Sequence, residues 1–418
     1  MSASPLFPAM VSPLLLVGLV VAVFVGFNIG GSSTGVAFGP AVGSNALSKL
    51  AAAALMSVFV LLGSWTVGRN VVTTLSTGIV PQELFTPAVS IAVLFFIGFA
   101  LFLSNVVGVP ASTSMTAVGA IAGLGLAAGQ LNEGEMLAIV SWWVVSPVVA
   151  FWVSGVIGRY FYPRLVESFA VTQTEGSLLA LDRSGTVPRP TLGPNTTRRE
   201  FVGTGLVVGI ACYMAFSAGA SNVANAVAPL VGNGSITLNQ GILLGAGAIG
   251  LGAFTIARRT LDTVGNDLTE MPLLAALVVA VVSATIITIL SALGVPASFV
   301  IVATMSIVGL GWGRATRTTT LSETVAGETP EVSVGALAAD TDPAAGGDRE
   351  VPTVGGRGGT PDPDARPEPI GDEASEDLPA AADLFEPGTT ARVIVLQNLV
   401  PALATVAAYL LFRFVPVF

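Results

Sequence analysis

The chain carries two duplicated pairs of segments, and this duplication constrains its fold more than any other feature. Residues 108–125, GVPASTSMTAVGAIAGLG, and residues 294–311, GVPASFVIVATMSIVGLG, are identical at ten of eighteen positions; we name them the GVPAS segments. Residues 30–48, GGSSTGVAFGPAVGSNALS, and residues 219–237, GASNVANAVAPLVGNGSIT, share six residues without a gap; we name them the serine-rich segments. Duplication of this kind predicts a protein built from two structural repeats.

The composition is that of a polytopic membrane protein. Of the 418 residues, 52% are hydrophobic and 10% are charged, and the mean hydropathy is +0.80. Sixteen of the 26 carboxylates lie between Glu323 and Glu386, so the net charge of −9 belongs mainly to one soluble segment. Acidic soluble parts with Lys49 as the single lysine indicate a halophilic archaeon as the source, although a GC-rich genome would also favour Arg over Lys.

Eight stretches are apolar and long enough to cross a bilayer as helices. In chain order they are Met10–Asn28, Leu50–Gly68, Phe85–Asn105, Met136–Tyr160, Phe201–Ser217, Gly241–Ala257, Met271–Leu293 and Arg392–Phe414. The duplicated segments lie between them at matching places, and they are too rich in Gly, Pro, Ser and Thr for ordinary membrane helices. The sequence therefore predicts an all-α polytopic membrane protein of two inverted-topology repeats with broken or re-entrant helices.

The predicted domains follow from the repeats and two polar stretches. Residues 1–160 form repeat one, residues 161–199 a cytoplasmic linker, and residues 200–314 with 391–418 repeat two. Residues 315–390 are rich in Pro, Gly, Thr, Asp and Glu. This acidic cytoplasmic insertion is predicted to be disordered, because it cannot bury enough apolar surface to offset the loss of chain entropy.

The distribution of basic residues predicts the topology. If the serine-rich segments re-enter and the GVPAS segments cross, each repeat crosses five times, and the two repeats are oppositely oriented. With both termini outside, only Arg69 and Arg413 of the 17 basic residues lie outside, as the positive-inside rule requires. We expect a multi-pass protein of the plasma membrane, with Trp142, Trp143 and Trp152 as lipid-facing or interfacial anchors.

The duplicated segments also supply the candidate binding site. The N-termini of half-helices favour anions, and small hydroxyl groups can surround a tetrahedral oxyanion. The predicted anion ligands are Ser32, Ser33, Ser112, Thr113, Ser114, Ser221 and Ser298, and the predicted cation ligands are Asn222 and Asn225 with backbone carbonyls. The alternative for each hydroxyl is a packing residue that bonds to its own helix.

The coupling ion follows from what these segments lack. They contain no carboxylate, His or Arg, so a buried anion needs a co-transported cation for charge compensation. A proton relay usually needs an ionisable side chain, which favours Na⁺ over H⁺. No other cofactor is expected.

Several motifs resemble the inorganic phosphate transporter family, which carries twin signature repeats. GASNVANAVAPLVG from Gly219 is similar to its GANDVANA-type motif, and GVPASTSMTAVGA from Gly108 to its later G-x-P-V-S-T-T-H-type motif. RTLDTVGNDLT from Arg259 and VVTTLSTGIV from Val71 resemble two further family segments. The resemblance implies a phosphate or sulfate permease with alternating access around a midplane site, and it allows for a homodimer.

The chain departs from the family pattern at the expected charged positions. The family Asp falls on Ser33 and Asn222, and the family His falls on Met115 and Ile301. Without these carboxylates, the site is expected to bind cations more weakly than the family pattern implies. It is also expected to suit sulfate as well as phosphate. The prediction is a phosphate importer driven by cation symport, with a sulfate permease as the alternative.

Two other classes of protein compare less well with these features than a transporter. Gly-rich re-entrant segments also build the filters of ion channels, so an anion channel is a further alternative. A membrane enzyme is disfavoured, because the sequence has no His and no catalytic carboxylate pair in an apolar segment. Nothing in the sequence indicates nucleic-acid binding.

Overall fold

A computed structural model of the chain describes residues 12–44, 46–107, 112–169, 179–182, 189–192, 198–255, 272–316 and 387–415. These residues are almost wholly helical. The helices are α1 Pro13–Gly43, α2 Lys49–Thr66, α3 Gly68–Thr73, α4 Pro87–Val107, α5 Thr113–Ala128, α6 Glu133–Val156, α7 Tyr162–Phe169, α8 Arg198–Gly232, α9 Leu238–Thr255, α11 Leu273–Ala292, α12 Phe299–Ala315 and α14 Pro387–Phe414. Shorter helical turns are η1 Thr74–Gly78, η2 Gln82–Leu84 and η3 Ile157–Phe161.

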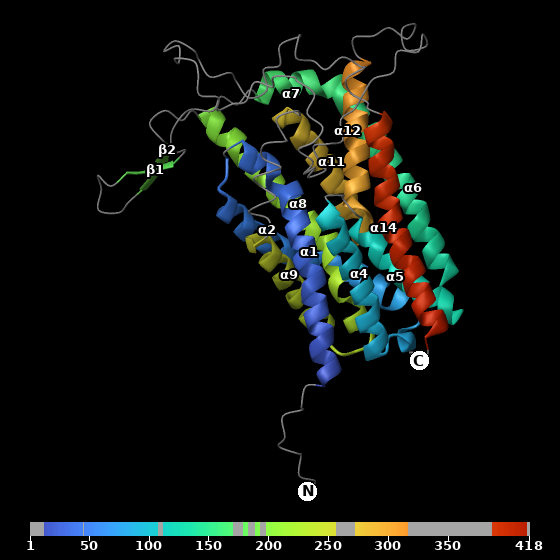
Figure 1. The fold of residues 1–418 in the computed structure, drawn as a ribbon. Coiled ribbons are helices and arrows are strands. Elements are labelled where there is room, and N and C mark those ends of the chain that lie inside the picture. Colours follow the sequence, from blue (N-terminus) through green and yellow to red (C-terminus); the bar gives the residue numbers. More distant parts are fainter. Residues whose placement is uncertain are drawn as a thin grey trace.

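The helices confirm the prediction of an all-α polytopic membrane protein. Within the described residues, seven helices are long and apolar enough to cross a membrane, and Thr113–Ala128, Phe299–Arg314 and Asn398–Phe414 are shorter apolar helices. Helix α1 begins and α14 ends at the same end of the bundle, and α7 lies across the opposite end (Figure 1). The side of the membrane on which the termini lie stays a prediction.

The two polar stretches contribute little to the described bundle. The linker contains α7 and a small antiparallel hairpin of β1 Leu179–Asp182 and β2 Arg189–Leu192. This hairpin is the one exception to the helical fold among the described residues. The predicted disorder of the acidic insertion concerns residues that lie almost entirely outside the described ranges.

Helices from the two repeats pair with each other. Helix α1 packs against α9, α2 against α8, α5 against α14, and α6 against α12. In chain order, α1, α2, α5 and α6 of repeat one correspond to α8, α9, α12 and α14 of repeat two. Exchanging each helix for its counterpart gives the same four pairs. The repeats therefore interlock instead of forming two separate bundles, while their inverted orientation stays a prediction.

Glycines allow the closest of these helix contacts. A Cβ atom on Gly219 would overlap the backbone carbonyl of Val60 on α2, and a Cβ atom on Gly63 would overlap the carbonyl of Phe216 on α8. Gly30, the counterpart of Gly219, lies equally close to the backbone of α9. Small residues let membrane helices approach closely, and packing is what holds such helices together in lipid.

The serine-rich segments are not broken, so this part of the prediction is wrong. Helix α1 continues through Gly43 and α8 through Gly232. The small residues serve helix packing, and some of the hydroxyl groups donate to carbonyls of their own helix. Thr34, for example, donates to the carbonyl oxygen of Gly30 at 2.7 Å.

The second GVPAS segment is broken, as predicted. Helix α11 ends at Ala292, and α12 begins only at Phe299. Gly294 adopts a φ of 77°, and the N–H of Val295 donates to the carbonyl of Leu290 at 2.8 Å. This is the Schellman ending of a helix, and the following Pro296 has no N–H with which to resume one. In the first GVPAS segment, residues 108–111 lie outside the described ranges.

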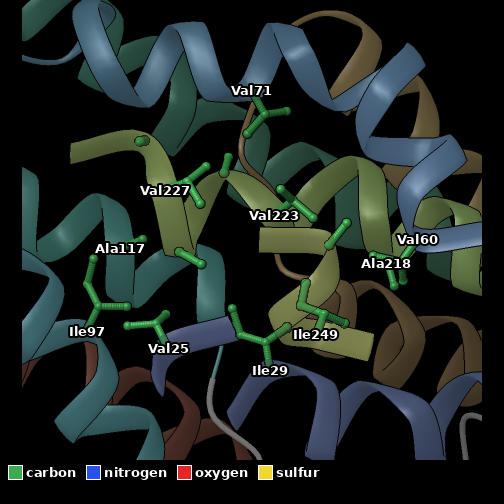
Figure 2. Close-up of a cluster of buried hydrophobic side chains, with 14 of the residues drawn as sticks. Val25, Ile29, Val60, Val71, Ile97, Ala117, Ala218, Val223, Val227 and Ile249 are labelled. Carbon is green, nitrogen blue, oxygen red and sulfur yellow. The ribbon is translucent and has the colours of Figure 1, made fainter. Parts of the chain in front are cut away.

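The apolar core holds α8 in a defined rotation. Val223 and Val227 of α8 are fully buried. They lie in one cluster with Val25 of α1, Ile97 of α4 and Ile249 of α9 (Figure 2). This face of α8 packs against helices of both repeats, which fixes the rotation of α8 about its axis. The direction of its polar side chains Ser221, Asn222 and Asn225 is thereby fixed as well.

Candidate functional site

The fifth residue of each GVPAS segment is a serine that caps the following helix. The Oγ atom of Ser112 accepts from the N–H of Met115 at 3.2 Å, at the start of α5. The Oγ atom of Ser298 accepts from the N–H of Ile301 at 3.3 Å, at the start of α12. Both serines are buried. The first N–H groups of these two helices have no carbonyl one turn earlier, so they are available to an anion.

The start of α5 meets the polar face of α8. The Oγ atoms of Ser114 and Ser221 lie 3.3 Å apart, and the Nδ2 of Asn225 donates to Ser114 Oγ at 3.3 Å. Thr113 Oγ1 donates to the Oδ1 of Asn222 at 2.6 Å. Hydroxyl groups of repeat one are thereby joined to a hydroxyl and two amides of repeat two.

Ser221 connects this contact to the second GVPAS segment. Its Oγ donates to the backbone carbonyl of Ala297 at 3.2 Å. Because Ser221 has a single hydroxyl proton, Ser114 is the donor in the bond between the two serines. Hydrogen bonds therefore run in one direction from Asn225 through Ser114 and Ser221 to Ala297. We name Ser112–Ser114, Ser221, Asn222, Asn225 and Ala297–Ser298 the polar cluster.

One oxygen of the polar cluster has no partner. The Oδ1 of Asn225 is buried and accepts no hydrogen bond from the described residues, and Asn225 as a whole is 0% exposed. An unsatisfied buried acceptor costs about 1–3 kcal/mol, so its presence calls for an explanation. Pro229 also lacks the N–H that would pair with the backbone carbonyl of Asn225. Asn225 thus offers oxygen atoms of the kind that Na⁺ prefers.

The polar cluster is electrically neutral. None of its side chains is ionisable, and its partial positive charge comes from the two helix starts and from hydroxyl and amide hydrogens. Among the described residues, no group of three or more His, Cys, Asp or Glu side chains could hold a metal ion. The arrangement offers hydrogen-bond donors and amide and carbonyl oxygen atoms, but it has no general acid or base.

The structure brings seven of the nine predicted site residues together in the polar cluster. Ser32 and Ser33 are not joined to it by hydrogen bonds. Ser32 donates to the carbonyls of Asn28 and Ile29 in its own helix, and Ser33 makes no hydrogen bond within the described residues. A role for these two serines as anion ligands stays a prediction.

Sequence reasoning missed one backbone group of the polar cluster and one side chain that fixes the end of α8. The carbonyl of Ala297 belongs to the backbone, which a side-chain pattern does not reveal. Ser90 of α4 donates to the carbonyl of Pro229 at 2.9 Å and accepts from Asn233 at 2.9 Å, which fixes the end of α8. In the sequence, the one indication of a turn at this end of α8 is the pair Asn233-Gly234.

Comparison with known proteins identifies the family of the chain. Residues 29–332 match the family model described as the phosphate transporter family. The sulfate permease CysP of Bacillus subtilis is 31% identical over 300 residues, which cover 72% of this chain and 77% of that protein. A Pyrococcus furiosus protein that is provisionally named a phosphate permease is 24% identical over 373 residues, covering 74% and 89%.

A solved structure shares the fold. It is described as "The sodium-dependent phosphate transporter", and it superposes with a TM-score of 0.63 at 19% identity, over 97% of this chain and 100% of that one. The family match extends across both GVPAS segments and both serine-rich segments. This chain therefore belongs to the phosphate transporter family, whose members are membrane permeases and not enzymes.

Proposed function

We propose that this permease imports inorganic phosphate by symport with a cation, and that the cation is Na⁺. One observation carries the proposal. Two serine-capped helix starts, at Ser112 and Ser298, are brought to the same polar face of α8, where Ser221 hydrogen-bonds to both GVPAS segments. A tetrahedral oxyanion placed there would meet donors from both repeats.

The anion would be held by backbone N–H groups and hydroxyl groups. The N–H groups of Phe299 and Val300 begin α12 and have no partner within the described residues. The Ser114 and Ser221 hydroxyls now bond within the cluster, so binding would exchange these bonds for bonds to the anion. Helix dipoles add stabilisation of about 0.3–2 kcal/mol for each helix start.

The cation would be held by oxygen atoms of α8. The unpartnered Oδ1 of Asn225 is the first ligand, and the Oδ1 of Asn222, which lies 3.4 Å from the Nδ2 of Asn225, is the second. A doubly charged anion in a low dielectric needs compensation, and the polar cluster has no side chain that could carry a proton. The name of the solved relative, a sodium-dependent transporter, agrees with this choice.

Alternating access would arise from movement of paired helices around the polar cluster. Gly123 of α5 packs against the backbone of Thr405 on α14, and Gly309 of α12 against the backbone of Phe151 on α6. Contacts this close favour movement of α5 with α14 and of α12 with α6. Each pair carries one GVPAS segment, so relative movement of the pairs would open and close the site.

Sulfate is the second candidate substrate, and two observations favour it. The relative with 31% identity is named a sulfate permease. In addition, the polar cluster contains no carboxylate to accept the proton of hydrogen phosphate, whereas sulfate carries no proton at neutral pH.

Uptake by proteoliposomes tests the proposed function. Purified protein should accumulate labelled phosphate when Na⁺ is high outside, and replacing Na⁺ by K⁺ should abolish accumulation. Unlabelled sulfate serves as the competitor, and a protonophore should leave uptake unchanged. Failure to take up either anion would contradict the proposal, and saturable sulfate uptake without phosphate uptake would establish the second candidate. Flux without saturation or Na⁺ dependence would indicate a channel.

Loss of the Ser112 hydroxyl should weaken anion binding. In Ser112→Ala, α5 loses its cap, which costs about 1 kcal/mol, and the site loses a donor. We expect the KM for the anion to rise about fivefold to tenfold. Ser48 caps α2 in the same way, with the N–H of Ala51 at 3.3 Å, but lies outside the polar cluster. Ser48→Ala is therefore the matched control, and equal KM values for the two variants would rule out a role for Ser112 in binding.

A further inference from the structure

Trp143 does not behave like the other tryptophans of α6. All three were expected to be lipid-facing or interfacial anchors, and Trp142 and Trp152 are exposed, at 36% and 55%. Trp143 is instead half-buried and packs against the apolar core. Its indole Nε1 donates to the backbone carbonyl of Pro296 at 2.8 Å.

The accepting carbonyl lies in the break of the second GVPAS segment. Residues 295–298 are buried and have no helical hydrogen-bond ladder of their own. Three of their four carbonyls accept from three different helices: Pro296 from Trp143 of α6, Ala297 from Ser221 of α8, and Ser298 from the N–H of Val302 in α12. These three bonds fix the path of the break, and Trp143 supplies the one that comes from α6.

Helix α6, which carries Trp143, packs closely against α12. Gly309 and Gly313 of α12 lie against the backbone of Phe151 and Gly155 on α6, so closely that neither glycine could carry a Cβ atom. Two turns away, the rigid indole of Trp143 reaches the break that precedes the same helix. Helix α6 therefore contacts α12 through these glycines and contacts the break before α12 through Trp143.

We propose that Trp143 is a positioning residue for the anion site. Its N–H holds the Pro296 carbonyl, and through it the Ala297 carbonyl and the first N–H groups of α12, in the arrangement that receives the anion. Without this donor, the buried carbonyl is left unpaired, and the break is free to move away from Ser221. The effect on transport rests on the proposed function, whereas the effect on the break does not.

Hydrogen exchange on the anion-free protein tests the structural part. Trp143→Phe keeps an aromatic ring but removes the N–H, and Trp142→Phe makes the same change at the neighbouring exposed position. The amides of Ile301 and Val302, which donate to Ser298, should exchange about tenfold faster in Trp143→Phe than in wild type, and at the wild-type rate in Trp142→Phe. Equal exchange in both variants would overturn the proposal, whether or not the protein transports anything.

Transport kinetics test the consequence for the site. Trp143→Phe should raise the KM for the anion about tenfold at an unchanged amount of folded protein, while Trp142→Phe keeps the wild-type KM. If Trp143→Phe only lowers the yield of folded protein and leaves KM unchanged, the residue is structural and the positioning role is refuted. If the wild-type protein transports neither anion, the proposed function fails, and the exchange result still decides the role of Trp143.

Discussion

Asn225→Leu is expected to raise the Na⁺ concentration for half-maximal uptake about tenfold to a hundredfold. The change removes the unpartnered Oδ1 and the donor to Ser114, with little change in side-chain volume. Loss of one ligand to a charged group corresponds to about 1.5–3 kcal/mol. Na⁺ titration of anion uptake in proteoliposomes measures the shift.

An asparagine outside the site provides the control for this change. Asn239 is exposed at the start of α9, where its Oδ1 accepts from Arg69. Asn239→Leu should leave Na⁺ dependence unchanged, because an exposed hydrogen bond adds little stability. An Asn225→Leu protein that folds and keeps the wild-type Na⁺ dependence would show that the cation binds elsewhere.

Gly219→Val is expected to prevent assembly of the bundle. A Cβ atom there would overlap the carbonyl oxygen, Cα and carbonyl carbon of Val60, which are backbone atoms without rotamers to change. The α2–α8 crossing would have to widen, and the core around α8 would lose its packing. Overpacking typically costs 1–3 kcal/mol or more. Size-exclusion profiles of detergent-solubilised protein should show aggregate in place of the folded peak.

The same helix offers a matched control for the glycine substitution. A Cβ atom on Gly209 meets no atom within 4 Å, so Gly209→Val should give the wild-type profile. Both variants change the helix propensity of α8 in the same way, which leaves the contact with Val60 as the difference between them. A folded, monodisperse Gly219→Val protein would contradict the assignment of this glycine to close packing.

The outcome for the duplicated segments shows what local sequence can predict. The break at residues 294–298 was predicted correctly, because Gly294 and Pro296 act on their own backbone. The serine-rich segments were predicted to break and did not. Glycine has a low helix propensity, so these glycines suggested a break. Where two membrane helices cross, however, the absence of a Cβ atom lets the backbones approach closely, and this contact stabilises both helices.

The neutral character of the site was also readable from the sequence. Asn222 and Ser33 stand where the resemblance led us to expect carboxylates, and the polar cluster accordingly contains none. In contrast, Ser33 was grouped with the anion ligands because of its segment, and the structure joins it to no member of the cluster by a hydrogen bond.

The sequence alone determined the features that depend on neighbours along the chain. Ser112 and Ser298 cap their helices three residues ahead, because the backbone geometry of a helix start places that N–H within reach. Which hydroxyl meets which amide was decided only by the tertiary structure. Ser114 and Ser221 are 107 residues apart in the chain, and the packing of α5 and α8 in an interlocked bundle brings them together, since no local rule specifies where two helices cross.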